Sequence, residues 1–235
     1  MQNNMKAVMI LNINNEISSP EQKIITILND SDLVWLQEKT HKYMTLMSYY
    51  KCAMMEIETK LKVLNEEFSL NFDRNPISSI KTRLKTPVSI KNKLENLGYK
   101  VSVDAIEQHL NDVAGIRVVC SFVEDVYSIA KALLKQDDIK LITAKDYIQS
   151  PKENGYRSLH LIVEIPIYLS HHKKTMKVEI QLRTIAMDFW ASLEHQLNYK
   201  KNHVLTDKMK EELLLCAQIS AELDEKMDDL RKELC

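Results

Sequence analysis

The shortage of glycine most limits what this chain can fold into: its 235 residues include three, Gly98, Gly115 and Gly155. These glycines are widely separated, so the sequence contains neither a P-loop nor a G-x-G-x-x-G turn, two glycine-rich loops that commonly hold nucleotide phosphates. If the chain binds nucleotides, side chains rather than a glycine-rich backbone must hold the phosphates.

The charges of the chain are nearly balanced. Lysine and arginine total 32 and aspartate and glutamate 33, so any site for a polyanion, RNA included, must be a local patch. The four cysteines form no C-x-x-C pair, and no stretch approaches the ~18 apolar residues of a membrane span. No export signal is recognisable at the N-terminus. We therefore expect a cytoplasmic protein with reduced thiols and no membrane contact.

Apolar residues recur at helical spacing through residues 32–68, which contain neither glycine nor proline. This pattern predicts one long amphipathic helix whose apolar stripe packs on the core or on another subunit. Residues 69–80 are interpreted as a connection into a second region. Further helices are predicted at about 88–97, after Ser102, and at about 124–136, 185–200 and 206–233.

The central part of the chain changes to the periodicity of strands. Strands are predicted at 113–122, 139–147, 158–166 and 175–183, the last two joined by a hairpin connection over 167–174. Strands interrupted by a helix and followed by a hairpin predict a mixed sheet in an α+β fold flanked by helices. We expect an N-terminal helical extension over 1–70, a sheet-containing domain over 71–200 and a C-terminal helix over 201–235.

The predicted strand 175–183 alternates strictly between apolar and polar residues. Glu179, Gln181 and Arg183 share one face of this strand. That face is either the half-exposed side of an ordinary sheet or the floor of an active site.

Asp112 stands just before an apolar strand, and Arg117 is embedded in that strand. A buried arginine needs either an internal salt bridge or a ligand. Strict alternation would place the two side chains on opposite faces, so they converge only if the chain is irregular near Gly115.

The segment K-T-R-L-K-T-P-V-S-I-K-N-K (81–93) carries five basic residues and no acidic one. Arg83 and Lys85 lie on one side of an extended segment, and Ser89 and Lys93 share one face near a helix N-terminus, where a phosphate is favoured. The alternatives are a solvated basic face and a patch that contacts RNA.

The stretch P-K-E-N-G-Y-R-S-L-H (151–160) surrounds one of the three glycines. Lys152 supplies a cation, Gly155 permits a tight turn, and Tyr156 offers a ring for stacking a base. His160 follows on the next strand. At such positions a tyrosine or histidine is either a ligand-binding residue or part of the core.

Five motifs in order resemble the synthetase domain of the RelA/SpoT homologue superfamily, and most closely the small alarmone synthetases: R-L-K-T-P-V-S-I-K-N-K, D-V-A-G-I-R-V, K-E-N-G-Y-R-S-L-H, V-E-I-Q-L-R-T and M-D-F-W-A-S-L-E-H-Q-L-N-Y-K. They extend from Arg83 to Lys200. The resemblance implies a nucleotidyltransferase-like fold that transfers pyrophosphate from ATP to the 3′-hydroxyl of GDP or GTP and releases AMP.

The resemblance also implies roles for individual residues. Arg83 and Arg117 match the arginines that enclose adenine, and Lys85, Ser89 and Lys93 match residues that hold the ATP phosphates. Asp112 and Glu179 match the carboxylates at a magnesium ion, and Glu179 is also a candidate acceptor for the proton of the attacking hydroxyl. Tyr156 matches the guanine-stacking tyrosine, while Lys152, His160 and Gln181 match acceptor-binding positions.

Further expectations follow from the same resemblance. The bifunctional members carry a hydrolase domain with an adjacent His-Asp pair; this sequence has no such dipeptide, and 82 residues before Arg83 are too few for that domain. We therefore expect synthesis without hydrolysis, in a homo-oligomer, by resemblance a tetramer. Asp188 departs from relatives that have Asn there. The alternative function is a catalytically silent nucleotide- or RNA-binding regulator on the same fold.

Overall fold

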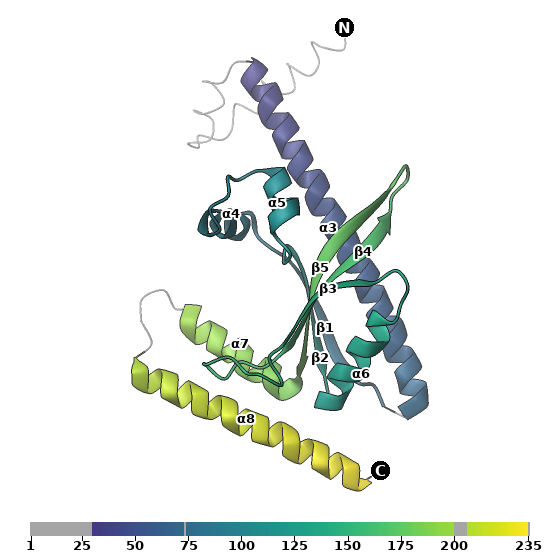
Figure 1. Ribbon diagram of the computed structural model, residues 1–235, viewed down its shortest axis with the longest axis vertical. Coiled ribbons are helices and arrows are strands. Elements are labelled where there is room, and N and C mark those ends of the chain that lie inside the picture. The colour runs from purple at the N-terminus through teal and green to yellow at the C-terminus, as the bar shows by residue number, and fades with distance from the viewer. Residues whose placement is uncertain (1–29, 73, 200–205, 235) are drawn as a thin grey trace, which may run out of the picture. The chain divides into compact units, whose positions relative to one another are not determined.

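The computed structural model describes residues 30–72, 74–199 and 206–234 (Figure 1). The chain divides into two compact units, residues 1–45 and 46–235, and the helix α3 (Asp30–Phe72) includes this division. The predicted helix 32–68 is thereby confirmed. The predicted boundary between residues 200 and 201 lies outside the described residues, as do residues 1–29 of the predicted extension. These domain limits remain predictions.

A five-stranded mixed sheet forms the centre of the second unit. Its strands are β1 (Ile77–Leu84), β2 (Ala114–Cys120), β3 (Lys140–Asp146), β4 (Leu159–Tyr168) and β5 (Lys173–Thr184). They are arranged in the order β1-β2-β5-β4-β3. β2 and β5 are parallel and the other neighbours antiparallel, so the predicted α+β fold with a mixed sheet is confirmed.

The prediction that residues 69–80 are only a connection is wrong, because strand β1 begins at Ile77. β1 lies at the edge of the sheet and pairs only with β2, and its register shifts between Ile77 and Ser79. Ile77 is its one fully buried residue. An edge strand with an irregular register and little burial has no clear alternation of apolar and polar residues. Strand β1 could therefore not be predicted from the sequence.

The hairpin connection is shorter than the predicted range 167–174. It consists of residues 169–172, with Leu169 N donating a 2.9 Å hydrogen bond to His172 O. β4 continues through Pro166 because β3 pairs with β4 only as far as Glu164. Pro166 therefore lies on a stretch of strand with a single neighbour, where a proline is tolerated.

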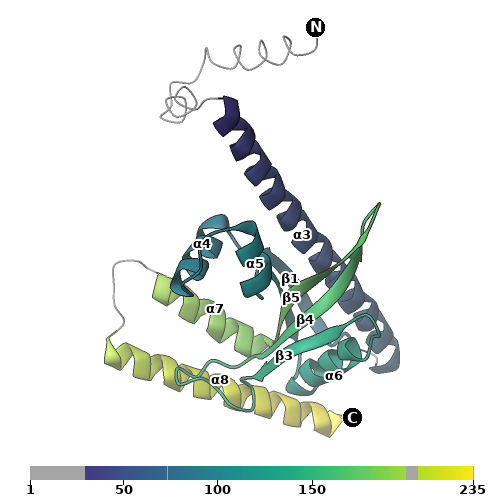
Figure 2. The same ribbon diagram turned by 45° about the horizontal axis from the view of Figure 1, so that its top comes forward.

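Helices cover the sheet on both sides. In Figures 1 and 2, α6 (Val123–Leu134) and the part of α3 after Thr45 lie along one face, while α4 (Pro87–Asn96), α5 (Val103–His109) and α7 (Ile185–Tyr199) lie on the other. α8 (Asp207–Leu234) packs against α7. The core side of the sheet is fully buried at Val118, Val178 and Ile180. Among the helices of the described ranges, none has both the length and the apolar character needed to cross a bilayer.

Candidate active site

A polar cleft of about 370 Å³ opens on the face of the sheet opposite α6. Three adjacent strands, β1, β2 and β5, supply most of its walls. Its lining residues are Lys81, Thr82, Arg83, Lys85, Asp112, Gly115, Ile116, Arg117, Glu179 and Gln181. Most of the ATP-side and metal residues predicted from the sequence thus meet in one cleft.

The register of the strands explains why these side chains converge. Arg83 pairs with Gly115, and Gly115 pairs with Glu179. Residues that pair across neighbouring strands point to the same face, so these positions form one row across the cleft. The next row contains the pairs Lys81–Arg117, Arg117–Gln181 and Gln181–His160. The polar face of the predicted strand 175–183 therefore contributes Glu179 and Gln181 to the floor of a cleft.

Asp112 and Arg117 both reach the cleft without a bulge. The expectation that they converge only through an irregularity near Gly115 is therefore wrong. The pairing of β2 is regular on both sides of Gly115. Asp112 instead precedes the first strand residue, Ala114, so the alternation of the strand does not govern its direction. Both residues line the cleft, Asp112 from the segment just before β2 and Arg117 from β2 itself.

Two lysines meet on the carboxylate of Asp112. Lys85 Nζ lies 2.7 Å and Lys93 Nζ 2.6 Å from Asp112 Oδ2. Burial raises the pKa of Asp112, but the hydrogen bonds and positive charges of the two lysines outweigh this, so its pKa lies below the usual value. Asp112 is therefore an anion at neutral pH, held by cations from β1's end and from α4.

The second oxygen of this carboxylate, Asp112 Oδ1, is buried and has no hydrogen-bond partner within the described residues. An unpaired carboxylate oxygen beside a second carboxylate is a suitable ligand for a hard cation. In the described ranges no cluster of three or more His, Cys, Asp or Glu side chains is arranged to hold a metal by itself. The site therefore fits Mg²⁺, which is commonly held by one or two carboxylates together with substrate phosphates.

Glu179 is embedded in a hydrogen-bonded chain of side chains. Gln181 Nε2 donates to Glu179 Oε2 at 3.1 Å, and His160 Nδ1 lies 3.5 Å from Glu179 Oε1. Burial raises the pKa of Glu179 and the nearby charge of Asp112 adds to this, but the contacts with His160 and Gln181 together outweigh both, leaving the pKa below its usual value. Glu179 is an anion that faces the cleft.

Arg183 extends this chain of side chains, and no functional role was predicted for it. Its side chain is 5% exposed, and its NH2 donates to Tyr156 Oη at 2.6 Å and to Gln181 Oε1 at 3.0 Å. Tyr156 Oη also lies 2.7 Å from His160 Nε2. Because Arg183 can only donate, the tyrosine oxygen accepts from it, and His160 joins this hydroxyl to Glu179 through its two ring nitrogens.

Asp188 connects two arginines of the site. Its Oδ1 lies 3.3 Å from NH1 of both Arg117 and Arg183, and its Oδ2 lies 3.8 Å from Lys81 Nζ. Arg117 belongs to the cleft and Arg183 to the chain that leads to Tyr156 and His160. The carboxylate from α7 therefore fixes both guanidinium groups, and the internal salt bridge considered for Arg117 is present.

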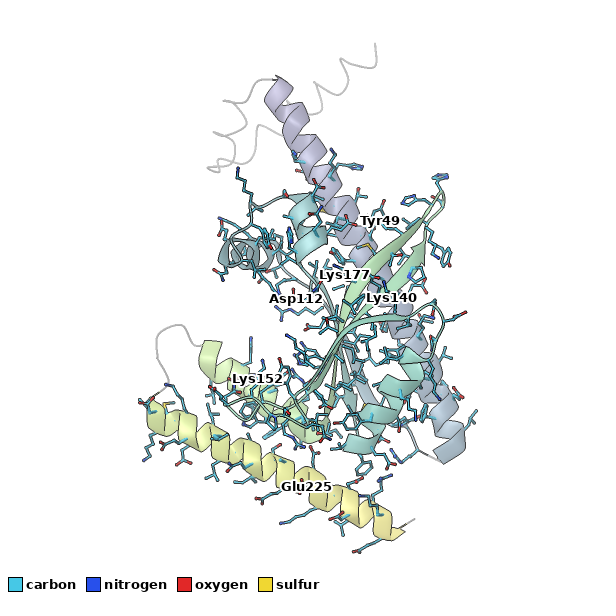
Figure 3. The ribbon with its side chains drawn as sticks, in the orientation of Figure 1. Tyr49, Asp112, Lys140, Lys152, Lys177 and Glu225 are labelled. Carbon is cyan, nitrogen blue, oxygen red and sulfur yellow. The ribbon has the colours of Figure 1, made fainter. Side chains whose placement is uncertain are left out.

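Lys152 and Tyr156 lie beside the cleft, in the segment between β3 and β4. Lys152 Nζ lies 4.9 Å from the ring centroid of Tyr156 and 4.8 Å from that of Tyr147. Figure 3 shows Lys152 on the same side of the sheet as Asp112, near α7. Tyr147 was not singled out by the sequence, where it follows the Lys-Asp pair at the end of β3.

Two details of the predicted site differ from a simple phosphate cradle. Ser89 Oγ lies 2.8 Å from Thr86 Oγ1, the N-cap of α4, and does not line the cleft. Gly155 has φ +85°, so the predicted tight turn is present. This glycine also lies against α8, where an added Cβ would be 2.4 Å from Ala217 Cβ.

Comparison with known proteins gives consistent results. A family described as "Region found in RelA / SpoT proteins" matches residues 82–204. The GTP pyrophosphokinase YwaC of Bacillus subtilis (strain 168) is 44% identical over 185 residues, 79% of this chain and 88% of that protein.

Solved structures agree. Small alarmone synthetase 2 from B. subtilis has a TM-score of 0.74 and 42% identity, covering 81% of this chain and 98% of that chain. Small alarmone synthetase 1 from B. subtilis, bound to its product pppGpp, has a TM-score of 0.72 and 36% identity, covering 78% of this chain and 93% of that chain. The cleft and its motifs lie largely within the matched region. The chain therefore belongs to the RelA/SpoT family, and it is a GTP pyrophosphokinase of the small alarmone synthetase type.

Proposed function

We propose that this enzyme transfers the pyrophosphoryl group of ATP to the 3′-hydroxyl of GDP or GTP and releases AMP. The observation that carries the proposal is the meeting of Asp112 and Glu179 in one cleft, with cations on one side and the His160–Tyr156 chain on the other. A silent binding protein would have little use for two carboxylates at that point. We divide the cleft into two halves, one proposed to bind ATP and the other proposed to bind the acceptor nucleotide.

The ATP half is formed by β1, α4 and the start of β2. Arg83 and Arg117 line the cleft from paired strands, and planar guanidinium groups suit the faces of an adenine ring. Lys85 and Lys93, which meet on Asp112, carry the positive charge that triphosphate oxygens need. Ser89, in the first turn of α4, is proposed to contact a phosphate after exchanging its contact with Thr86.

The acceptor half is formed by β4, β5 and the segment between β3 and β4. Tyr156 is proposed to stack on the guanine, with Lys152, His160 and Gln181 contacting the same nucleotide. Glu179 lies between the two halves and carries a negative charge at neutral pH. It is therefore proposed to take the proton from the attacking 3′-hydroxyl.

Mg²⁺ is the proposed cofactor, with Asp112 and Glu179 as its protein ligands. When bound, it would neutralise charge that develops on the transferred phosphoryl groups. The unpaired Asp112 Oδ1 supports this assignment.

We further propose that the enzyme synthesises alarmone without hydrolysing it and acts in the cytoplasm as a homo-oligomer, by family resemblance a tetramer. RNA binding is not part of the proposal, because the formal net charge of −1 gives no overall attraction for a polyanion. The exposed apolar side chains on the outer face of α8 support self-association.

The test is a product assay with purified protein, ATP and GMP, GDP or GTP supplied separately. We expect one AMP for each guanosine 3′-diphosphate formed with GDP or GTP. Release of ADP or inorganic phosphate in place of AMP would overturn the proposal. Adding ppGpp with Mn²⁺ tests the absence of hydrolysis: release of pyrophosphate would contradict it.

A further inference from the structure

The C-terminal helix α8 lies outside the region 82–204 that the family shares, yet it contacts the segment proposed to bind the acceptor. In both Figures 1 and 2 the segment between β3 and β4 extends beside α7 toward α8. The contacts between α8 and the segment 151–158 are close and specific.

The first contact is steric. Gly155 lies against Ala217 and Leu214 of α8, and a Cβ at Gly155 would come within 2.4 Å of Ala217 Cβ and 3.2 Å of Leu214 Cδ1. Tyr156, the next residue, packs on a small buried cluster of Trp190, Ala191 and Ala217. The backbone that carries the proposed guanine-stacking ring therefore rests directly on α8.

The second contact involves charge. Asp224 of α8 is 8% exposed, and its Oδ2 accepts a 2.7 Å hydrogen bond from Thr184 Oγ1 at the end of β5. The same Oδ2 lies 4.0 Å from NH1 of Arg157, which directly follows Tyr156. This NH1 is buried and has no hydrogen-bond partner within the described residues, so Asp224 is the anion that offsets its charge.

α8 itself is firmly attached to the catalytic unit. Trp190 Nε1 donates to Leu213 O at 2.9 Å, and Ser220 Oγ donates to Ala186 O at 3.0 Å. These bonds join α8 to α7, the helix that also carries Asp188. Because α8 is held by α7, it can in turn hold the irregular segment 151–158 in place.

From these contacts we infer that α8 positions the acceptor-binding segment, with Ala217 and Asp224 as positioning residues that act through Gly155, Tyr156 and Arg157. The inference rests on the proposed function, because it concerns how the same site recognises its acceptor. Loosening α8 weakens binding of GDP or GTP and leaves the ATP half unaffected, since Arg83, Lys85 and Lys93 lie on other elements.

The first test compares Asp224→Asn with Glu225→Gln in the full-length chain. Both remove one carboxylate charge from neighbouring positions of α8, but Glu225 is exposed (Figure 3). We expect Asp224→Asn to raise the KM for the acceptor by roughly fivefold or more, the factor expected on removing the partner of a buried charge. The KM for ATP is expected to change by less than about twofold, as for a distant site. Glu225→Gln is expected to leave both values unchanged.

The second test uses the steric contact and does not depend on Asp224. Gly155→Ala is expected to raise the acceptor KM, and adding Ala217→Gly to the same chain is expected to recover part of the loss by removing the opposing Cβ. Recovery is partial because φ +85° remains unfavourable for alanine. A merely structural role would move both KM values together.

An unchanged acceptor KM in folded Asp224→Asn, or equal rises in both KM values, would overturn the inference. If Asp224→Asn does not fold, the comparison of Gly155→Ala with Gly155→Ala/Ala217→Gly decides. The activity of the wild-type protein distinguishes a failure of this inference from a failure of the proposed function. An inactive wild type refutes the function, whereas an active wild type with insensitive variants refutes only the role of α8.

Discussion

At the scale of single residues, Tyr156 has two separate functions: its ring is proposed to stack on guanine, and its hydroxyl contacts two side chains. Arg183 NH2 donates to it at 2.6 Å, and His160 Nε2 lies 2.7 Å away. Removing the hydroxyl leaves a buried guanidinium with one partner fewer. The ring and the hydroxyl of this tyrosine therefore make separable contributions.

We predict that Tyr156→Phe keeps the stacking ring but lowers the free energy of unfolding by about 1–3 kcal/mol, because a buried donor loses its acceptor. Tyr156→Ala also loses the ring and is expected to raise the acceptor KM by roughly 5- to 150-fold, from a stacking contribution of about 1–3 kcal/mol. ATP KM should change little in both. Steady-state kinetics and urea unfolding measure these effects; a Phe variant as impaired as Ala in acceptor KM would refute stacking.

Asp112 and Glu179 are two carboxylates in one cleft and would repel each other. Asp112 is nevertheless stabilised as an anion, because Lys85 and Lys93 both contact it. Its pKa is lowered in the folded protein, so the stability it contributes is present above the unfolded-state pKa, near 4, and is lost as pH falls through the folded-state pKa. Removing this carboxylate leaves Lys85 and Lys93 without their shared anion.

We therefore predict that Asp112→Asn lowers turnover by orders of magnitude and also lowers the free energy of unfolding at neutral pH by about 1–3 kcal/mol. The stability difference from wild type should shrink below about pH 4, where the carboxyl begins to protonate in the unfolded state, and should be lost below its lower folded-state pKa. Urea unfolding at a series of pH values gives the comparison. A variant more stable than wild type at pH 7 would show that the lysines do not stabilise Asp112.

At the scale of elements, α4 links helix capping to the ATP half of the site. Thr86 caps the helix by accepting from Ser89 N at 3.3 Å, and its hydroxyl also contacts Ser89 Oγ. Lys93, one of the two lysines on Asp112, lies near the other end of the same helix.

We predict that Thr86→Ala lowers the free energy of unfolding by about 1 kcal/mol, the usual contribution of an N-cap. It should also raise the KM for ATP while leaving that for the acceptor unchanged, since only the ATP half includes α4. Lys91→Ala is the matched control, because Lys91 is an exposed residue of the same helix whose ion pair, within the described residues, is with Glu95. Equal effects of the two substitutions on ATP KM would contradict a role for the cap.

Most helices and strands could be predicted from the sequence. One strand and several side-chain contacts could not, for different physical reasons. Strands β2, β4 and β5 have clear periodicity because one face of each is buried, whereas β3 was predicted although none of its residues is buried. β1 is a mostly polar edge strand and was missed. The roles of Arg183 and Asp188 were also missed, because the burial of Arg183 depends on α7 packing at the end of β5. The contact of Gly155 with Ala217 joins distant segments and has no local signature.

At the scale of the whole molecule, the outer face of α8 carries a stripe of exposed apolar side chains at spacings of three and four residues. Leu215, Ile219, Leu223, Met227 and Leu230 are between 49% and 56% exposed. This face is opposite the one that carries Ala217 and Asp224. Stripes of this kind usually mark an interface, and for this chain we propose a second copy.

We predict that light scattering at micromolar concentration gives a mass that is a multiple of one chain. The double substitution Ile219→Glu/Leu223→Glu should shift the protein to smaller species, because charges on the stripe oppose its burial. Glu222→Gln, an exposed residue of the same helix, serves as the control. A wild-type mass equal to that of a single chain would refute self-association.

The central claim is that Glu179 completes a pyrophosphoryl-transfer site in the cleft lined by β1, β2 and β5. Its most direct test is the initial rate of product formation from ATP and GDP by Glu179→Gln and by Glu164→Gln. Glu164 lies on the neighbouring strand β4, is partly buried and pairs with Lys140 outside the cleft. We predict a loss of at least about 100-fold for Glu179→Gln, as for loss of a charged group that acts in the transition state, and near wild-type activity for Glu164→Gln. A folded Glu179→Gln enzyme with near wild-type rate would contradict the account.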